Sequence, residues 1–230
     1  MIIHHYNSDG IIDFTTNLDC NQVPENFTNL PLPEITNKQA LKYENNQIVI
    51  VSNYSVVYNT ITKEPKEVKP GYILQENETD LQPTQFSVWE NNNWVYSETL
   101  EKNYLIEKLS EIIEKNHKDK LWSGVNVQDY IIRVDKDSKN EISAVATQYQ
   151  LFGVHPTEWV AEYKVLNGQK IEGSENARLP LNADNLMNFF ITTATFYSNC
   201  FFERRDLLDS LVTKTVNELK QMEAQYVINN

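Results

Sequence analysis

The sequence contains one short pattern twice, as Tyr-Glu-Asn-Asn-Gln-Ile-Val at residues 43–49 and as Trp-Glu-Asn-Asn-Asn-Trp-Val at residues 89–95. Asparagine tolerates the left-handed backbone that a tight hairpin turn requires, and the flanking aromatic and β-branched residues favour strands. A proline-containing stretch precedes each copy, and before it stands a Tyr-Asn pair, Tyr6-Asn7 or Tyr58-Asn59. The pattern recurs at an offset of 46 residues, which indicates a duplicated small β unit.

Residues 1–99 therefore predict a series of short strands in two units, about 1–52 and 53–99. Alternation of apolar and polar residues, broken by turn-forming residues, is typical of hairpins. Units of this size depend on their aromatic residues to form a core. The expected strands are Ile2–Tyr6, Ile11–Thr15, Ala40–Tyr43, Ile48–Ser52, Ser55–Tyr58, Phe86–Trp89 and Trp94–Ser97.

A change of pattern near residues 98–102 marks a domain boundary. Six of the eight prolines precede residue 100, and beyond it apolar residues recur at helical spacing. This predicts a connecting helix over about 101–118, within a connecting segment at 100–120. Its apolar face consists of Tyr104, Leu105, Leu109, Ile112 and Ile113.

Residues 121–230 predict an α+β domain. A strand is expected at Asp129–Val134 and a helix at Ser138–Leu151. The Asn167-Gly168 pair predicts a hairpin that joins Trp159–Val165 to Gln169–Gly173. The predicted fold class is α+β, with tandem small antiparallel β units at the N-terminus and an α+β domain ending in a long helix.

The last predicted helix is unusually long. Asn182 is a good N-cap, and no Gly or Pro occurs from Ala183 to about Glu223. At 1.5 Å per residue, roughly 40 residues would span some 60 Å, more than a domain of this size covers. We therefore expect part of its apolar stripe to pack against another chain, or the helix to fold back at Glu203-Arg204-Arg205-Asp206.

Composition excludes several kinds of partner. The 230 residues are 40% hydrophobic, enough for packed cores, and the net charge of −12 would repel nucleic acid and anionic membranes. There is no signal-peptide pattern and no run of about 18 apolar residues. The two cysteines, Cys20 and Cys200, are far apart, which predicts a reducing cytoplasm and no disulfide.

The sequence carries no catalytic motif. It lacks Gly-x-Ser-x-Gly, a phosphate-binding Gly-rich loop and His-Glu-x-x-His. His4 and His5, with Asp9 and either His117 or His155, form an unpromising metal site, because adjacent strand residues point to opposite faces. We expect a binding protein without metal or cofactor, and not an enzyme.

Aromatic residues are the candidate binding groups, since Trp and Tyr are enriched at interfaces. Trp89 and Trp94 flank the second turn, and Tyr43 stands at the matching place in the first. Packing in small cores is the alternative role for these residues. In the last helix, Phe196 and Phe201 belong to a stripe that covers more than one face, which favours burial on two sides, within the fold or in a homo-oligomer.

The order of these elements resembles that of phage tail fibre assembly proteins. Those chains open with a Tyr-turn-Gly strand pair, here residues 6–10, and continue with a proline-bearing stretch and two Trp/turn/Trp hairpins separated by a Val-Tyr-Asn-Thr-like strand. Val57-Tyr58-Asn59-Thr60 matches that strand, and residues 89–94 match the second hairpin. The first hairpin departs from the pattern, with Tyr43 and Ile48 in the aromatic places, and the Arg-Gly often found before the Val-Tyr step is missing.

Residues 123–224 resemble an uncharacterised domain found at the C-terminus of phage tail proteins. The similar features are Tyr130-Ile131-Ile132-Arg133-Val134-Asp135 with Asn140 and Ile142, Trp159 with the Asn167-Gly168 turn, and Leu181-Asn182-Ala183.

Together these resemblances imply a non-enzymatic protein that binds a trimeric phage tail fibre protein and assists its folding or trimerisation. It would act in the host cytoplasm and then leave the fibre or remain on the virion tail. One alternative is a structural tail or baseplate component whose C-terminal helix oligomerises. Another is an enzyme or glycan-binding module that uses exposed aromatic side chains as sugar platforms.

Overall fold

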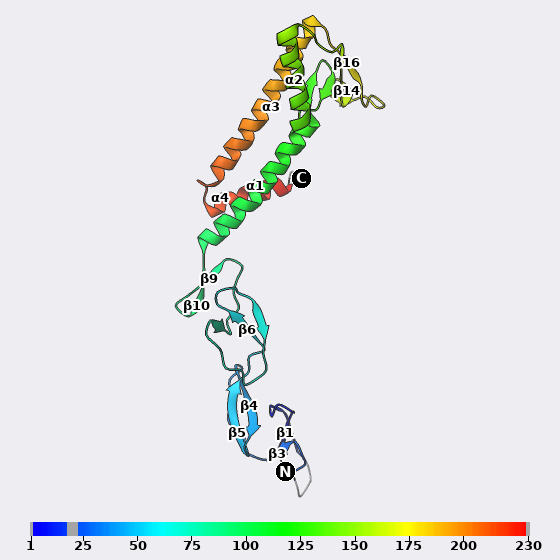
Figure 1. Cartoon of the computed structure of the whole chain (residues 1–230). Helices are drawn as coiled ribbons and strands as arrows, with labels where there is room; N and C mark the ends of the chain where they lie inside the picture. The colour runs from blue at the N-terminus through cyan, green and yellow to red at the C-terminus, as the bar shows by residue number, and fades with distance from the viewer. Residues whose placement is uncertain (1, 18–22, 229–230) are drawn as a thin grey trace. The chain divides into compact units, whose positions relative to one another are not determined.

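The computed structural model describes residues 2–17 and 23–228 of the chain (Figure 1). The chain divides into two compact units, Met1–Leu100 and Glu101–Asn230. The first is built from short antiparallel strands, and the second contains helices with a smaller amount of strand. The predicted α+β class is confirmed. Cys20 lies outside the described residues.

The N-terminal unit repeats one arrangement, a three-stranded sheet followed by a two-stranded hairpin. In both sheets the first strand along the chain is central, and the next two pair with it antiparallel. The first copy consists of β1 (Ile2–Tyr6), β2 (Ile12–Asn17) and β3 (Phe27–Thr28) with hairpin β4 (Gln39–Glu44) and β5 (Gln47–Ser52). The second consists of β6 (Val56–Asn59), β7 (Pro65–Glu67) and β8 (Glu78–Thr79) with hairpin β9 (Ser87–Glu90) and β10 (Asn93–Tyr96).

Equivalent side chains make the same local hydrogen bonds in both copies. The buried hydroxyl of Thr28, at the end of β3, accepts from the Leu30 amide at 3.3 Å. Thr79, at the end of β8, accepts in the same way from the Leu81 amide at 3.2 Å. Each bond fixes the chain as it leaves the sheet toward its hairpin.

The hairpin turns form as their asparagines predict. Asn45 and Asn46 have φ values of 51° and 61°, and Asn91 and Asn92 have 50° and 60°. Two successive residues with positive φ are the signature of the type I′ turn, whose twist matches that of the flanking strands. The turn therefore sets the register of both hairpins.

The C-terminal unit surrounds a small sheet with helices. Its strands lie in the order β11-β12-β14-β15, and β13 pairs separately with β16. The helices are α1 (Glu98–Ser123), α2 (Lys136–Phe152), α3 (Ala183–Leu211) and α4 (Val216–Ile228). The strands are β11 (Val125–Val127), β12 (Tyr130–Ile132), β13 (Glu158–Val160), β14 (Tyr163–Leu166), β15 (Gln169–Lys170) and β16 (Arg178–Pro180).

Helix α3 contributes to two separate hydrophobic cores. Its first half packs with the strands and α2, and its last turn packs with α1 and α4 (Figure 1). The first core contains Val127, Ile132, Ile142, Ala161, Leu179, Leu181, Leu186 and Phe189. The second contains Leu105, Leu109, Ile113, Leu211, Val216 and Leu219.

One predicted hairpin differs from the structure. The Asn167-Gly168 turn is confirmed, with Leu166 paired to Gln169. The predicted strand Trp159–Val165, however, breaks after Val160, and Trp159 pairs with Leu179 in β16. The break lets the Ala161 amide donate a hydrogen bond to the Ala177 carbonyl at 2.8 Å. The alternation of residues around Ala161 does not reveal this partner.

The predicted long helix also differs. It ends at Leu211 and resumes as α4 at Val216, so the reversal, at residues 212–215, begins six residues after the predicted site at residues 203–206. The reason is a capping box: the Glu218 carboxylate accepts from the Thr215 amide at 2.8 Å, and the Thr215 hydroxyl accepts from the Glu218 amide at 3.3 Å. The expected cap at Asn182 is present.

Replacing Asn92 tests the turn. Asn92→Val is expected to lower the free energy of unfolding by about 1–2 kcal/mol, because a β-branched side chain is strained in left-handed backbone. Asn92→Gly is the matched control and should cost much less, since glycine adopts this backbone freely. Urea unfolding followed by circular dichroism measures both, and equal losses would contradict the turn geometry.

Candidate partner-binding surfaces

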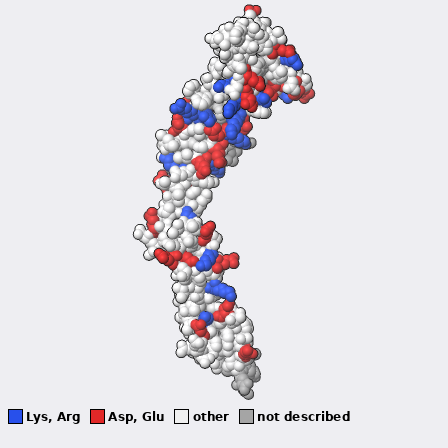
Figure 2. Space-filling model, viewed as in Figure 1, with Lys and Arg blue, Asp and Glu red and all other residues white. Residues whose placement is uncertain are grey.

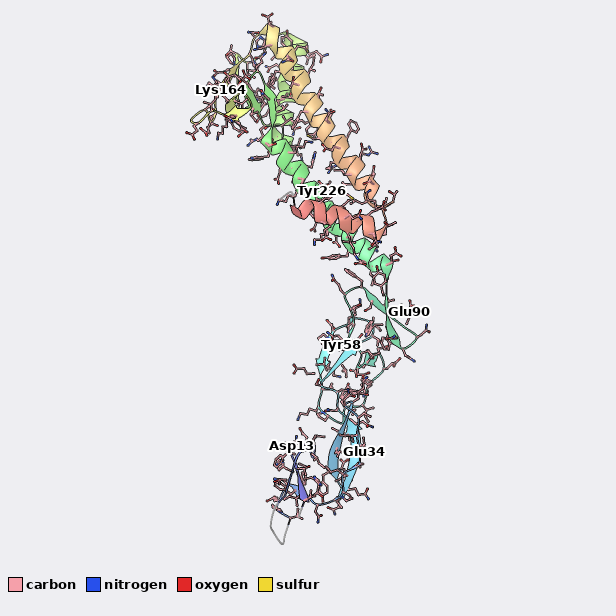
Figure 3. All side chains as sticks on the ribbon, turned by 180° about the vertical axis from the view of Figure 1, so that it is seen from behind. Asp13, Glu34, Tyr58, Glu90, Lys164 and Tyr226 are labelled. Carbon is pink, nitrogen blue, oxygen red and sulfur yellow. The ribbon has the colours of Figure 1, made fainter. Side chains whose placement is uncertain are left out.

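The repeated hairpins place a pair of large side chains near each turn, one position outside the residues that directly flank it. Tyr43 pairs across the strands with Ile48, and Trp89 pairs with Trp94. Glu90 follows Trp89 at the turn end of the second hairpin (Figure 3). The two hairpins therefore present the same arrangement at the same distance from their turns.

The two tryptophans are partly used for packing within the unit. Their rings meet edge to face with centroids 5.1 Å apart, and both side chains are half-buried. The indole Nε1 of Trp94 donates to the Leu81 carbonyl at 2.7 Å. Trp94 thus attaches the hairpin to the segment that follows β8.

Tyr43 has a similar role in the first copy. Its ring stacks on Tyr6 of β1, with centroids 4.7 Å apart, and its hydroxyl donates to Asn46 at 2.9 Å. The Tyr43 amide donates to the Gly10 carbonyl at 2.7 Å. A side chain at Gly10 would meet the Tyr43 carbonyl oxygen at 2.8 Å, so the hairpin approaches a position where only glycine fits.

The more exposed apolar side chains of these hairpins are Ile50 and Tyr96. They are 47% and 56% exposed and occupy equivalent positions at the same 46-residue offset. Strand alternation puts each on the same face as the pair of large side chains near its turn. Sequence reasoning missed both residues, although extending the repeat by one position and applying alternation would have found them.

A polar cluster joins the two outer strands of the second sheet to the segment between them. The Glu78 carboxylate on β8 accepts from Lys66 on β7 at 2.9 Å, from the Tyr72 hydroxyl at 2.7 Å and from the Gln75 amide at 2.9 Å. The Gln75 amide, with Tyr72 and Lys66, lowers the pKa of Glu78 to about 2. The carboxylate is therefore charged throughout the physiological range.

Helix α3 presents a second candidate surface. From Asn185 to Phe202 it contains no Asp, Glu, Lys or Arg. On its outer side, Met187, Ile191 and Phe202 are 53%, 57% and 56% exposed. Figure 2 shows charged side chains gathered on the other parts of the C-terminal unit and sparse where α2 ends and α3 begins.

The two predicted phenylalanines lie on different parts of this helix. Phe196 is half-buried and lies away from the outer side. Phe201 is exposed, and the Arg204 guanidinium lies over its ring at 5.6 Å from the centroid. Phe201 lies at the edge of the exposed apolar surface, whose centre sequence reasoning did not identify.

The far end of α3 is charged and attached to α1. Glu114 on α1 accepts from Arg204 at 2.7 Å, and Lys120 pairs with Glu203. Beside them lies a cavity of about 70 Å³ lined in part by His117 and Cys200. Burial, with the charge of Arg204, lowers the pKa of His117, and burial raises the pKa of the Cys200 thiol. The thiol is therefore protonated at neutral pH.

An open cleft of about 600 Å³ lies between α2 and the segment around β13. Its polar groups are engaged with one another or with neighbours: Arg133 lies 3.6 Å from Glu162 and Glu158 pairs with Arg178. A polar ligand would have to displace these pairs. The lining residues are Arg133, Ser138, Glu141, Val145, Pro156, Glu158, Trp159, Val160, Glu162 and Asn176.

Two kinds of feature are absent from residues 2–17 and 23–228, the part of the chain that the structure describes. Within these ranges no group of three or more His, Cys, Asp or Glu side chains is placed to hold a metal ion. In the same part of the chain, no helix combines the length and apolar character needed to cross a membrane.

Comparisons with protein-family models, with curated proteins and with solved structures find no match to this chain.

Substituting Trp94 tests its packing role. Trp94→Phe keeps the aromatic ring but removes the donor to Leu81, so the free energy of unfolding should fall by about 1 kcal/mol. Trp89→Phe is the control, because it keeps an aromatic contact at the other position of the pair. Circular dichroism during urea unfolding measures both, and an unchanged Trp94→Phe variant would contradict the assigned hydrogen bond.

The Glu78 cluster predicts a pH dependence. The folded-state pKa of Glu78, about 2, lies below the ordinary value of 4.5. The charged Glu78 carboxylate therefore contributes fully to stability above pH 4.5, and this contribution is lost as the pH falls toward 2. Between pH 7 and pH 3, the wild-type chain should lose more stability than Glu78→Gln. Urea midpoints at both values measure this, and parallel losses would contradict the cluster.

Proposed function

We propose that the chain is a non-enzymatic assembly protein that binds a phage or prophage tail fibre protein and assists its folding or trimerisation. The observation that carries this proposal is the repeated hairpin, which exposes an apolar residue at Ile50 and again at Tyr96. The resemblance to tail fibre assembly proteins supports the choice of partner.

A repeated surface is suited to a repetitive partner. Trimeric fibres present identical chains, and two equivalent contacts on one assembly protein make the second contact intramolecular once the first has formed. Interface energy is concentrated in a few large side chains surrounded by packed neighbours. Trp89, Trp94 and Tyr43 are proposed as the supporting neighbours of Ile50 and Tyr96.

The proposed mode of action is binding without chemistry in the bacterial cytoplasm. Folding assistance requires only that the apolar segments of a partner be covered until they pair with one another. The Ile50 and Tyr96 face provides such cover without a reactive group. The net charge of −12 helps to keep the complex soluble.

Co-expression with the adjacent fibre gene tests this proposal. We expect the tagged wild-type chain to copurify with the fibre and to raise its yield of soluble trimer. Ile50→Asp combined with Tyr96→Asp should remove most of that effect, because two charges would be buried in the complex.

Val95→Asp is the matched control for this experiment. Val95 is 42% exposed and adjacent to Tyr96, but it lies on the opposite face of the same strand. The Val95→Asp variant should leave the yield of soluble fibre trimer unchanged. Equal losses with Val95→Asp would contradict the assigned face, and no copurification of the wild-type chain would refute fibre binding.

A structural tail or baseplate component is the second candidate. The exposed, uncharged side of α3 favours it, because such a surface is typical of a helix covered in an assembly, here a homo-oligomer. Mass spectrometry of purified particles distinguishes the two functions. Stoichiometric amounts in the virion, without an effect on fibre yield, would favour the structural function.

A further inference from the structure

The outer side of α3 forms a continuous apolar ridge. Successive residues of an α-helix are rotated by about 100°, so Met187, Ile191, Ser198 and Phe202 fall on one side. All four are exposed, while the opposite side supplies buried residues such as Phe189 to the core. Within the described chain, this ridge is therefore turned away from the core that α3 helps to form.

On its own side of the helix, the ridge lies between Asp184 at one end and the ion pair of Arg205 with Asp209 at the other. Asp184 precedes the uncharged stretch and Arg205 follows it on the same side of the helix. Both side chains are exposed. Near the midpoint of the ridge stand the small residues Ala194 and Ser198, which border a cavity of about 150 Å³ beside α2 and are small enough to let a second helix approach closely.

We propose that this ridge pairs with the same ridge of a second copy of the chain, in antiparallel orientation. A two-fold axis between residues 194 and 195 places each Asp184 opposite Arg205 of the other copy. The same axis places Met187 opposite Phe202 and Ile191 opposite Ser198. Large side chains thus meet at both ends, a large side chain meets a small one between them, and Ala194 of each copy lies at the axis, so the ridge is self-complementary as a closed two-fold interface requires.

Charge decides between the two orientations. A parallel pair would place Asp184 near Asp184 and Arg205 near Arg205, and like charges across an interface are unfavourable. The antiparallel pair forms two attractive contacts instead. Arg205 already lies 3.6 Å from Asp209 on its own helix, but this exposed pair contributes little and leaves the guanidinium accessible.

The ridge pairing specifies how the structural component, the second candidate function, would form its homo-oligomer. It does not depend on fibre binding. It is tested on the purified chain alone by sedimentation velocity across a concentration series. The wild-type chain is expected to form a dimer. Ile191→Asp should abolish it, because the substitution places a charge at the centre of the apolar ridge. Ile61→Asp, at a 73% exposed site in the N-terminal unit, should not change it.

A charge exchange tests the orientation. Arg205→Asp and Asp184→Arg alone should each weaken the dimer by about tenfold or more, because each creates two repulsive contacts. The double variant should recover most of that loss. Circular dichroism checks that the helix is intact, since an arginine in the first turn opposes the helix dipole.

A wild-type chain that stays monomeric at its highest soluble concentration would overturn the proposal. A dimer that the double variant fails to restore would overturn the antiparallel orientation. Neither result bears on trimer yield in the co-expression experiment, so self-association and fibre binding are judged separately.

Discussion

Left-handed backbone at the two Asn-Asn turns, residues 45–46 and 91–92, is the constraint on which the N-terminal unit depends. A two-residue turn fixes which residues face each other across the hairpin, and a slip by one residue would move every side chain to the other face. The register that places Trp89 against Trp94 is therefore the one that exposes Tyr96. Turn chemistry and the proposed binding surface are consequences of the same asparagines.

Much of this unit could be predicted because its signals are local. Turn residues, alternation and the 46-residue offset lie within a few residues of the strands that they define. The two-residue strands β3 and β8 could not be predicted, because so short a segment has no alternation. Phe27 and Thr28 become a strand only by pairing with β1, more than 20 residues earlier in the chain.

In the C-terminal unit the errors come from partners that are distant in sequence and from one overlooked local signal. Trp159 pairs with Leu179 in β16, which no pattern around Trp159 indicates. Length and charge predict that α3 ends at residues 203–206, which is too early. The Thr-x-x-Glu pattern at Thr215 and Glu218, which starts a new helix without any Gly or Pro, was the better signal.

The candidate surfaces show why residue type alone does not identify a binding site. Trp94 is of a residue type that is enriched at interfaces. Its indole N–H, however, bonds to Leu81 and part of its ring is buried within the unit, while the exposed side chain is that of Tyr96, two residues later.

For α3, the sequence reveals the missing charges but not which side of the helix is covered. At 23% charged residues, an 18-residue stretch would contain about four charges, so their absence from an exposed ridge is the reason to propose that another surface covers it. The charges of Asp184 and Arg205 at its ends are the reason that a second copy of the same ridge is the proposed cover.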